Sequence, residues 1–203
     1  VEKGLEVIDT TCNDVIKSQV AMKDYLSQGY DVIYIGKHIH PESEAAQGIS
    51  DNVHLVYDEE TINNLTLTGK IAVTNQTTMS LYDVYNLSQY IKTIYPESVF
   101  IDEICNATRI RQEAVMKQEQ SDHLFVVGDK LSNNSLKLVQ VSIEQSGINA
   151  TLIESVKDID IEQLKQFDIV SVSSGASTPT RTTKEVIAFL EQFDKYNPQT
   201  HII

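Results

Sequence analysis

The 203-residue sequence predicts an α/β protein built from two similar units with parallel strands. Short apolar runs alternate with helical patterns along the chain, and polar loops follow several of the runs. The layout that begins at Cys12, with two polar loops at similar spacings, recurs after Cys105. A recurrence of this kind indicates a repeated supersecondary unit.

Six apolar runs rich in β-branched residues are expected to form the strands. They are almost continuously apolar rather than alternating, which is typical of strands covered on both faces of a parallel sheet. They occupy residues 31–36, 70–74, 98–102, 123–128, 150–154 and 168–173. Another strand-like run occupies residues 5–10.

Helical spacing appears between these runs. The best-defined pattern is the apolar series Leu81, Val84, Leu87, Ile91 and Ile94, with Ser80 as its start and Pro96 as its stop. A shorter series after residue 135 ends at Gly147, and a third follows Thr178 and Pro179, the expected N-cap and first-turn residues.

Three segments follow from this layout. Residues 1–100 form a unit with Cys12, residues 101–195 form a unit with Cys105, and residues 196–203 form a C-terminal tail. Because the chain begins at Val1 and enters a strand-like run almost at once, a further unit is expected upstream.

The formal charge of −13 and the pI near 4.7 argue against binding to nucleic acid or to an anionic membrane surface. No apolar run approaches the ~20 residues that span a bilayer, and no signal peptide opens the sequence. A cytoplasmic protein is expected. Its two distant cysteines are either buried thiols or ligands that converge only in the fold.

Four polar loops are expected beyond the carboxyl ends of the strands, where parallel sheets bind ligands. Ser132, Asn134 and Ser177 stand just before helices, whose free N–H groups favour an anion such as a phosphate or diphosphate. For any one of these side chains, simple helix capping is an alternative. His40 strengthens the anion-site interpretation.

Glu42, after His40 and Pro41, is a candidate proton donor if its carboxyl is buried, although a lone glutamate is usually a solvated surface group. Thr77 is a candidate for orienting a substrate hydroxyl, although paired threonines after a strand are usually turn residues.

Six motifs occur in an order that resembles the 4-hydroxy-3-methylbut-2-enyl diphosphate reductase (IspH/LytB) family. They are DTTCNDV (9–15), HPE (40–42), NQTT (75–78), CNATRIRQ (105–112), SNNS (132–135) and GAS (175–177). The resemblance extends over nearly the whole chain.

The resemblance implies a trefoil of three pseudo-repeated parallel α/β units around a central [4Fe-4S] cluster. Two of these units are visible here, with Cys12 and Cys105 as cluster ligands and the third cysteine ligand outside this chain. It further implies reductive removal of the allylic hydroxyl in non-mevalonate isoprenoid biosynthesis, giving isopentenyl and dimethylallyl diphosphates. The implied electron donor is ferredoxin or flavodoxin.

By motif match, Glu42 supplies the proton and Thr77 holds the hydroxyl, while the diphosphate is bound by His40, Ser132, Asn133, Asn134 and Ser177. Lys37 and Leu131 depart from the family pattern, and Leu131 removes a polar group beside the expected diphosphate loop. The alternative function is a degenerate, cluster-free module that binds a phosphorylated ligand.

Overall fold

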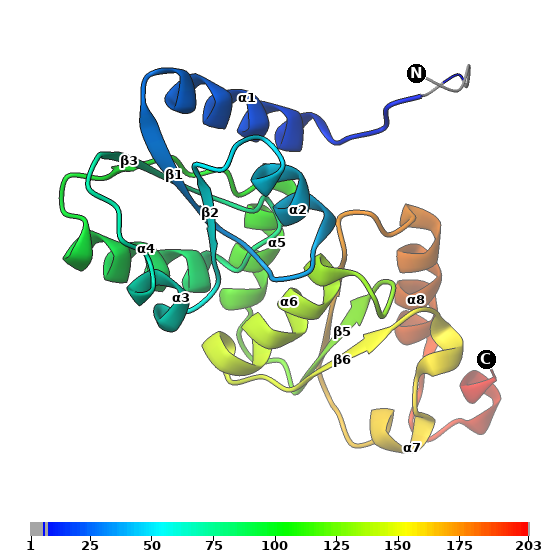
Figure 1. The fold of residues 1–203 in the computed structure, drawn as a ribbon. Coiled ribbons are helices and arrows are strands. Elements are labelled where there is room, and N and C mark those ends of the chain that lie inside the picture. The colour runs from blue at the N-terminus through cyan, green and yellow to red at the C-terminus, as the bar shows by residue number, and fades with distance from the viewer. Residues whose placement is uncertain (1–5, 7, 203) are drawn as a thin grey trace. The chain divides into compact units, whose positions relative to one another are not determined.

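A computed structural model describes residue 6 and residues 8–202 of the chain. The chain divides into two compact units, Val1–Cys105 and Asn106–Ile203. In both units helices flank a small parallel sheet, as can be followed by the labels in Figure 1.

Unit 1 alternates helices and strands from its first described element onward. Its elements are α1 (Asn13–Ser27), β1 (Tyr30–Ile35), α2 (Pro41–Gln47), β2 (Val53–Val56), α3 (Glu59–Asn63), β3 (Lys70–Asn75), α4 (Leu81–Ile94) and β4 (Val99–Phe100).

Unit 2 repeats the alternation. Its elements are α5 (Asn106–Met116), β5 (His123–Val127), α6 (Asn133–Val141), the π-helical turn η1 (Ser142–Ser146), β6 (Ala150–Ile153), the 3-10 turn η2 (Val156–Asp158), α7 (Ile161–Leu164), β7 (Val170–Ser174), α8 (Thr180–Gln192) and the 3-10 turn η3 (Pro198–His201).

The sheets confirm the internal repeat. The strand order is β2-β1-β3-β4 in unit 1 and β6-β5-β7 in unit 2, and every pairing is parallel. In each unit the first strand therefore lies between the next two strands of the chain. Each first strand is preceded by a helix that begins directly after a cysteine: α1 after Cys12 and α5 after Cys105. The predicted parallel α/β architecture is confirmed.

Each sheet is covered on both faces, as the continuous apolar runs predicted. In unit 1, Ile33 and Val73 pack with Ile91 of α4, while Val32 and Ala72 pack on the other face in a separate cluster. Unit 2 divides its core in the same way, with one cluster around Phe125 and Val127 and another around Leu124 and Val126.

Several helix boundaries match their sequence signals. The Ser80 hydroxyl accepts a hydrogen bond from Asp83 N at 3.3 Å and so caps α4. Gly147 follows η1 with φ +70°, a left-handed conformation in which glycine has no steric penalty.

Other expectations differ from the structure. Strand β2 was not predicted, and the described residues of the run 5–10 (6 and 8–10) form no strand; Leu5 and Val7 lie outside the described residues. Thr178 is not the N-cap of α8, because Pro179 takes that position and the Thr178 hydroxyl donates instead to Val127 O at 3.0 Å.

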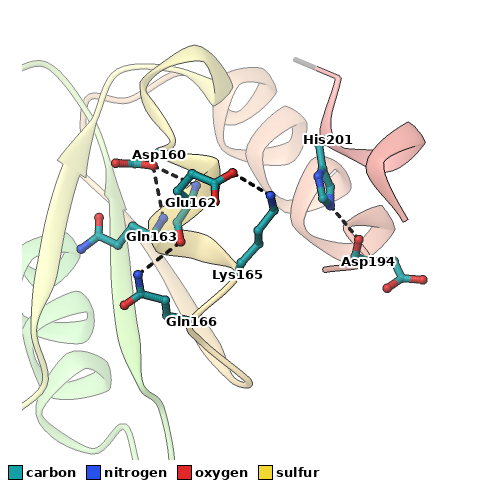
Figure 2. Close-up of polar contacts among 7 residues, drawn as sticks. All are labelled: Asp160, Glu162, Gln163, Lys165, Gln166, Asp194 and His201. Atoms are coloured by element: carbon teal, nitrogen blue, oxygen red, sulfur yellow. Dashed lines mark hydrogen bonds and ion pairs between the residues drawn. The ribbon is translucent and has the colours of Figure 1, made fainter. Parts of the chain in front are cut away.

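The C-terminal segment folds back on the end of α8. His201 Nε2 donates to the Asp194 carbonyl oxygen at 2.8 Å (Figure 2). The His201 ring also stacks on Phe193, with 4.7 Å between the ring centroids. Figure 2 also shows Asp160 capping α7 through hydrogen bonds from Glu162 N and Gln163 N.

Among the described residues, no helix combines the length and apolar character needed to cross a membrane.

Candidate functional site

In unit 1 two polar loops meet at the carboxyl edge of the sheet. The first follows β1 and the second follows β3, and these neighbouring strands end in register, with Ile35 opposite Asn75. The backbone continues this pairing by one step, because Gln76 N donates to Ile35 O at 2.8 Å. Residues from distant parts of the sequence thus come together at one edge.

Glu42 and Thr77 are in direct contact there. Thr77 N donates to Glu42 Oε1 at 2.8 Å, and the Thr77 hydroxyl donates to Glu42 Oε2 at 3.1 Å. Thr77 is buried and Glu42 is half-buried in the first turn of α2. The glutamate is therefore held by two hydrogen bonds rather than free at the surface.

Cys105 is linked to this pair by a backbone hydrogen bond, in which Cys105 N donates to Thr77 O at 3.0 Å. Cys105 immediately precedes α5, and Cys12 is the N-cap residue of α1. The positive end of a helix dipole stabilises negative charge near it. Neither cysteine forms a disulfide, and Cys12 is exposed whereas Cys105 is half-buried.

His40 is the N-cap of α2. Its Nδ1 accepts a hydrogen bond from Glu42 N at 3.1 Å, and burial lowers the pKa of its imidazole below the ordinary value. Both facts favour a neutral ring whose single proton lies on Nε2. His40 can thus donate one hydrogen bond from Nε2 while its other nitrogen caps the helix.

The residue before His40 is conformationally strained. Ile39 has φ +56° and is 77% exposed. A β-branched residue in the left-handed region is a genuine outlier, and such strain concentrates at functional loops. The loop therefore holds His40 in place at a local cost in stability.

Gln76 connects the two loops of unit 1 and is fully buried. Its Oε1 accepts from Lys37 N at 2.9 Å, and its Nε2 donates to the Thr78 hydroxyl at 3.0 Å. We attribute to Gln76 a structural role, because it uses both ends of its side chain to hold loop backbone and side chain together.

In unit 2 the equivalent loops lie at the N-termini of α6 and α8. Ser132 caps α6, because its hydroxyl oxygen accepts a hydrogen bond from Ser135 N at 3.3 Å. Helix capping, the alternative role considered for this residue, therefore does occur. The hydroxyl hydrogen remains available to a ligand. Asn133 is the first residue of α6 and is half-buried, while Ser177 is exposed in the loop before α8.

Asn134 and Ser135, near the start of α6, each carry a buried polar atom that no other described residue satisfies. Asn134 Oδ1 accepts from the Thr108 hydroxyl at 3.4 Å, but Asn134 Nδ2 and Ser135 Oγ have no hydrogen-bond partner within the described part of the chain. Asn134 is 6% exposed and Ser135 is fully buried. Unsatisfied buried groups are costly, so their presence at a helix N-terminus points to a polar guest.

Two glycines make room for Ser135. A Cβ atom on Gly128, after β5, would lie 2.2 Å from Ser135 Oγ, and a Cβ atom on Gly175, after β7, would lie 2.3 Å from it. Gly175 occupies the place of Gln76 in the repeat, because Gly175 N donates to Val127 O as Gln76 N does to Ile35 O. The glutamine that fills the loop in unit 1 is therefore absent from unit 2.

The predicted cluster ligands fit an iron–sulfur group in their chemistry, since cysteine thiolates are its usual ligands. The two cysteines of this chain, Cys12 and Cys105, are fewer than the protein ligands that such a cluster needs. Among residues 6 and 8–202, no three histidine, cysteine or acidic side chains gather in a way that could hold a metal ion.

The sequence analysis missed one residue of the site. Tyr34 lies within the predicted strand 31–36 and was given no role in the site, yet its hydroxyl donates to Glu42 Oε1 at 3.1 Å. The signal was a phenol close to the carboxyl end of a predicted strand, where ligands bind.

The chain is similar to known diphosphate reductases. It is 52% identical over 202 residues to 4-hydroxy-3-methylbut-2-enyl diphosphate reductase of Bacillus cytotoxicus (strain DSM 22905 / CIP 110041 / 391-98 / NVH 391-98), covering 98% of this chain and 64% of that protein. The reductase of the same name from Lysinibacillus sphaericus (strain C3-41) is 48% identical over 204 residues, covering 99% of this chain and 63% of that protein. The chain thus spans less than two thirds of the length of these relatives.

A solved structure and a family model agree with these relatives. The E-1-hydroxy-2-methyl-but-2-enyl-4-diphosphate reductase from Plasmodium falciparum matches with a TM-score of 0.86 and 31% identity, covering 90% of this chain and 59% of that one. The LytB protein family model matches residues 1–191. The chain with the Glu42–Thr77 pair and the repeated parallel sheets belongs to the LytB protein family.

Proposed function

We propose that this chain is the larger part of a reductase that converts 4-hydroxy-3-methylbut-2-enyl diphosphate into isopentenyl and dimethylallyl diphosphates in non-mevalonate isoprenoid biosynthesis. The observation that carries the proposal is the contact of Glu42 with Thr77, whose carbonyl accepts from Cys105 N. An acid, a hydroxyl and a cluster-type ligand are thereby linked within one unit. The names of the relatives support the same substrate.

The overall reaction replaces a carbon–hydroxyl bond by a carbon–hydrogen bond. Two electrons and two protons are consumed, and the hydroxyl leaves as water. We assign to Glu42 the delivery of a proton from its carboxyl, and to the Thr77 hydroxyl the orientation of the substrate hydroxyl. General acid catalysis of this kind requires a proton donor held in a fixed position, and the two hydrogen bonds from Thr77, which fix the Glu42 carboxyl, support this assignment.

The diphosphate is proposed to bind in unit 2. The N-terminus of α6, with Ser132 and Asn133 at its start, offers free backbone N–H groups to an anion. Asn134 Nδ2 supplies a buried donor that the described residues leave unsatisfied, and Ser177 supplies an exposed hydroxyl before α8. His40, neutral with its proton on Nε2, is assigned as a further donor to the diphosphate.

Cys12 and Cys105 are proposed to be two ligands of a [4Fe-4S] cluster, with the third cysteine in the part of the relatives' length that this chain does not span. When bound, such a cluster supplies electrons and a Lewis-acidic iron. We further propose that the protein is located in the cytoplasm and that ferredoxin or flavodoxin is its electron donor.

The test is a turnover assay on the full-length protein after reconstitution with iron and sulfide under anaerobic conditions. With a chemical reductant and 4-hydroxy-3-methylbut-2-enyl diphosphate, we expect both five-carbon diphosphates to form, and Cys105→Ser to lower bound iron and turnover together. A fully loaded protein that forms neither product contradicts the proposal. If the full-length protein takes up no cluster yet still binds inorganic diphosphate, the cluster-free binding module becomes the better account.

A further inference from the structure

Tyr34 reaches from the core of unit 1 to the carboxyl of Glu42. Its side chain is 1% exposed and packs with Met22, Val32 and Ala72 on one face of the sheet. The phenol hydroxyl nevertheless donates to Glu42 Oε1 at 3.1 Å. A tyrosine buried among apolar residues therefore directs its only polar atom to the candidate acid.

Gly36 makes this approach feasible. A Cβ atom at Gly36 would lie 2.7 Å from Cε1 of the Tyr34 ring and 2.7 Å from Ser43 Oγ, closer than real Cβ contacts come. The ring thus passes directly against the backbone at the end of β1. Any side chain at this position would displace either the ring or the start of α2.

The hydrogen bonds to Glu42 are unequally divided between its two oxygens. Oε1 accepts from Tyr34 Oη and from Thr77 N, at 3.1 and 2.8 Å. Oε2 accepts, within the described part of the chain, from the Thr77 hydroxyl alone, at 3.1 Å. The Thr77 N–H is a fixed donor, while the Thr77 hydroxyl can rotate and accept instead. A proton is therefore accommodated at Oε2 without loss of any existing contact.

We propose that Tyr34 is a positioning residue which, together with Thr77 N, occupies Oε1 and so confines the transferable proton of Glu42 to Oε2. The inference rests on the proposed role of Glu42 as proton donor. Protonation at Oε1 would force the phenol to turn its hydrogen toward the apolar cluster around it. The carboxyl thus presents its acidic oxygen in one orientation.

The phenol is suited to act as a permanent donor. Burial, followed by the nearby charge of Glu42, raises the pKa of Tyr34 far above its ordinary value. The hydroxyl consequently keeps its hydrogen throughout the pH range in which an enzyme operates. A serine or threonine at this strand position would be too short to reach the carboxyl from the core.

The internal repeat shows that the tyrosine is not required by the fold. In unit 2, Val126 takes the equivalent place on β5 and Asn134 the equivalent place on α6, by the matching strand registers and helix starts. Val126 is also fully buried. At these two equivalent positions, a phenol is paired with a carboxyl in unit 1, to which the acid is assigned, and a valine stands opposite an asparagine in unit 2.

The test compares Tyr34→Phe with Tyr30→Phe in the full-length, cluster-loaded protein. Tyr30 lies on the same strand and packs against the same cluster, so its replacement removes a hydroxyl without touching Glu42. We expect Tyr34→Phe to lower kcat about tenfold with KM changed less than about twofold, because only proton delivery is impaired. Tyr30→Phe should keep wild-type values of both.

A double-mutant cycle separates positioning from folding. If Tyr34 acts through Glu42, Tyr34→Phe has no further effect on the residual single-turnover rate of Glu42→Gln. A purely structural role for the phenol would instead lower the rate by the same factor in both backgrounds, and this result overturns the inference. Unchanged kcat in Tyr34→Phe overturns it as well.

Infrared spectroscopy tests the proposal without turnover. In spectra recorded at a pH low enough to protonate glutamates, the carboxyl carbonyl stretch that is lost in Glu42→Gln should move to higher frequency in Tyr34→Phe, because the Oε1 carbonyl loses a donor. An unmoved band shows that the phenol does not hold the carbonyl oxygen. A wild-type protein that carries the band but reduces no substrate would refute the proposed function alone.

Discussion

Glu42 and Thr77 are 35 residues apart in the sequence and are joined by two hydrogen bonds, one from the threonine backbone and one from its hydroxyl. The backbone bond holds the carboxyl whatever the side chain at position 77. Only the hydroxyl bond depends on threonine. The two contributions can therefore be separated by substitution.

Thr77→Val keeps the backbone bond and the side-chain shape but removes the hydroxyl from Glu42 Oε2. In the full-length protein we expect kcat to fall about tenfold, as is typical when one charge-assisted hydrogen bond is lost. Thr77→Ser restores the hydroxyl and should recover most of the rate. Equal rates for Thr77→Val and wild type would show that the hydroxyl has no part in the reaction.

Asn134→Ala tests the anion site of unit 2. If Asn134 Nδ2 binds a diphosphate oxygen, its loss weakens the affinity for inorganic diphosphate by roughly tenfold to a hundredfold, the usual worth of a hydrogen bond to a charged group. Isothermal titration calorimetry on the full-length protein gives this affinity. Asn149→Ala, which alters an exposed asparagine, serves as the control and should bind like wild type. Unchanged affinity in Asn134→Ala would remove this residue from the anion site.

Gly175→Ala should destabilise unit 2 by about 1–3 kcal/mol, because the new Cβ atom meets Ser135 Oγ at 2.3 Å. Ser135→Ala removes that oxygen and leaves Ser135 Cβ at 3.6 Å from the added atom, so that Thr178 Oγ1 at 3.1 Å is the tightest contact that remains. The double variant should therefore regain most of the lost stability in urea unfolding. Additive losses would mean that Ser135 is not what excludes a side chain at position 175.

Much of the fold was predictable from sequence because local patterns agree with the tertiary structure. The continuous apolar runs gave parallel strands covered on both faces, and Ser80 marked the start of α4. Strand β2 has only four residues and exists through its pairing with β1, so no local pattern revealed it. The run 5–10 illustrates the reverse, since its described residues have a strand-like composition but no strand partner.

The candidate site was predictable in its residue types but not in its contacts. The positions of Glu42 and Thr77 after two strands indicated a common sheet edge, because the ends of neighbouring parallel strands converge. The role of Tyr34 depends on the close approach of its ring to Gly36, which only the three-dimensional structure reveals. The contrast between Gln76, which fills the loop in unit 1, and Gly175, which leaves room for Ser135 in unit 2, likewise appears only when the two units are compared.

His123 provides a pH-dependent contribution to stability. It is buried on β5, stacks on Phe167 at 4.7 Å, and lies 2.8 Å from the Thr151 hydroxyl through Nε2. Burial lowers its pKa below the ordinary 6.5, so the folded state favours the neutral ring. The corresponding stability is fully present above pH 6.5 and is lost as the pH falls from there through the lowered folded pKa.

Thermal unfolding at pH 7.5 and pH 5.5, about one unit either side of the ordinary histidine pKa, measures this effect. We expect the midpoint of wild type to fall more between these pH values than that of His123→Gln, whose side chain cannot be protonated. His38→Gln, which removes an exposed imidazole, controls for the loss of any histidine. Identical pH dependence in wild type and His123→Gln would exclude His123 as the source.

The most direct test of the account is the single-turnover rate of Glu42→Gln in the full-length, cluster-loaded protein. Glu44→Gln, an exposed glutamate of the same helix, is the matched control. If Glu42 delivers the proton, Glu42→Gln keeps the bound iron and loses roughly a hundredfold to ten-thousandfold in rate, while Glu44→Gln reacts like wild type. A rate for Glu42→Gln equal to that of wild type, at equal iron content, would contradict the central claim that the carboxyl held by Thr77 is the acid of the reaction.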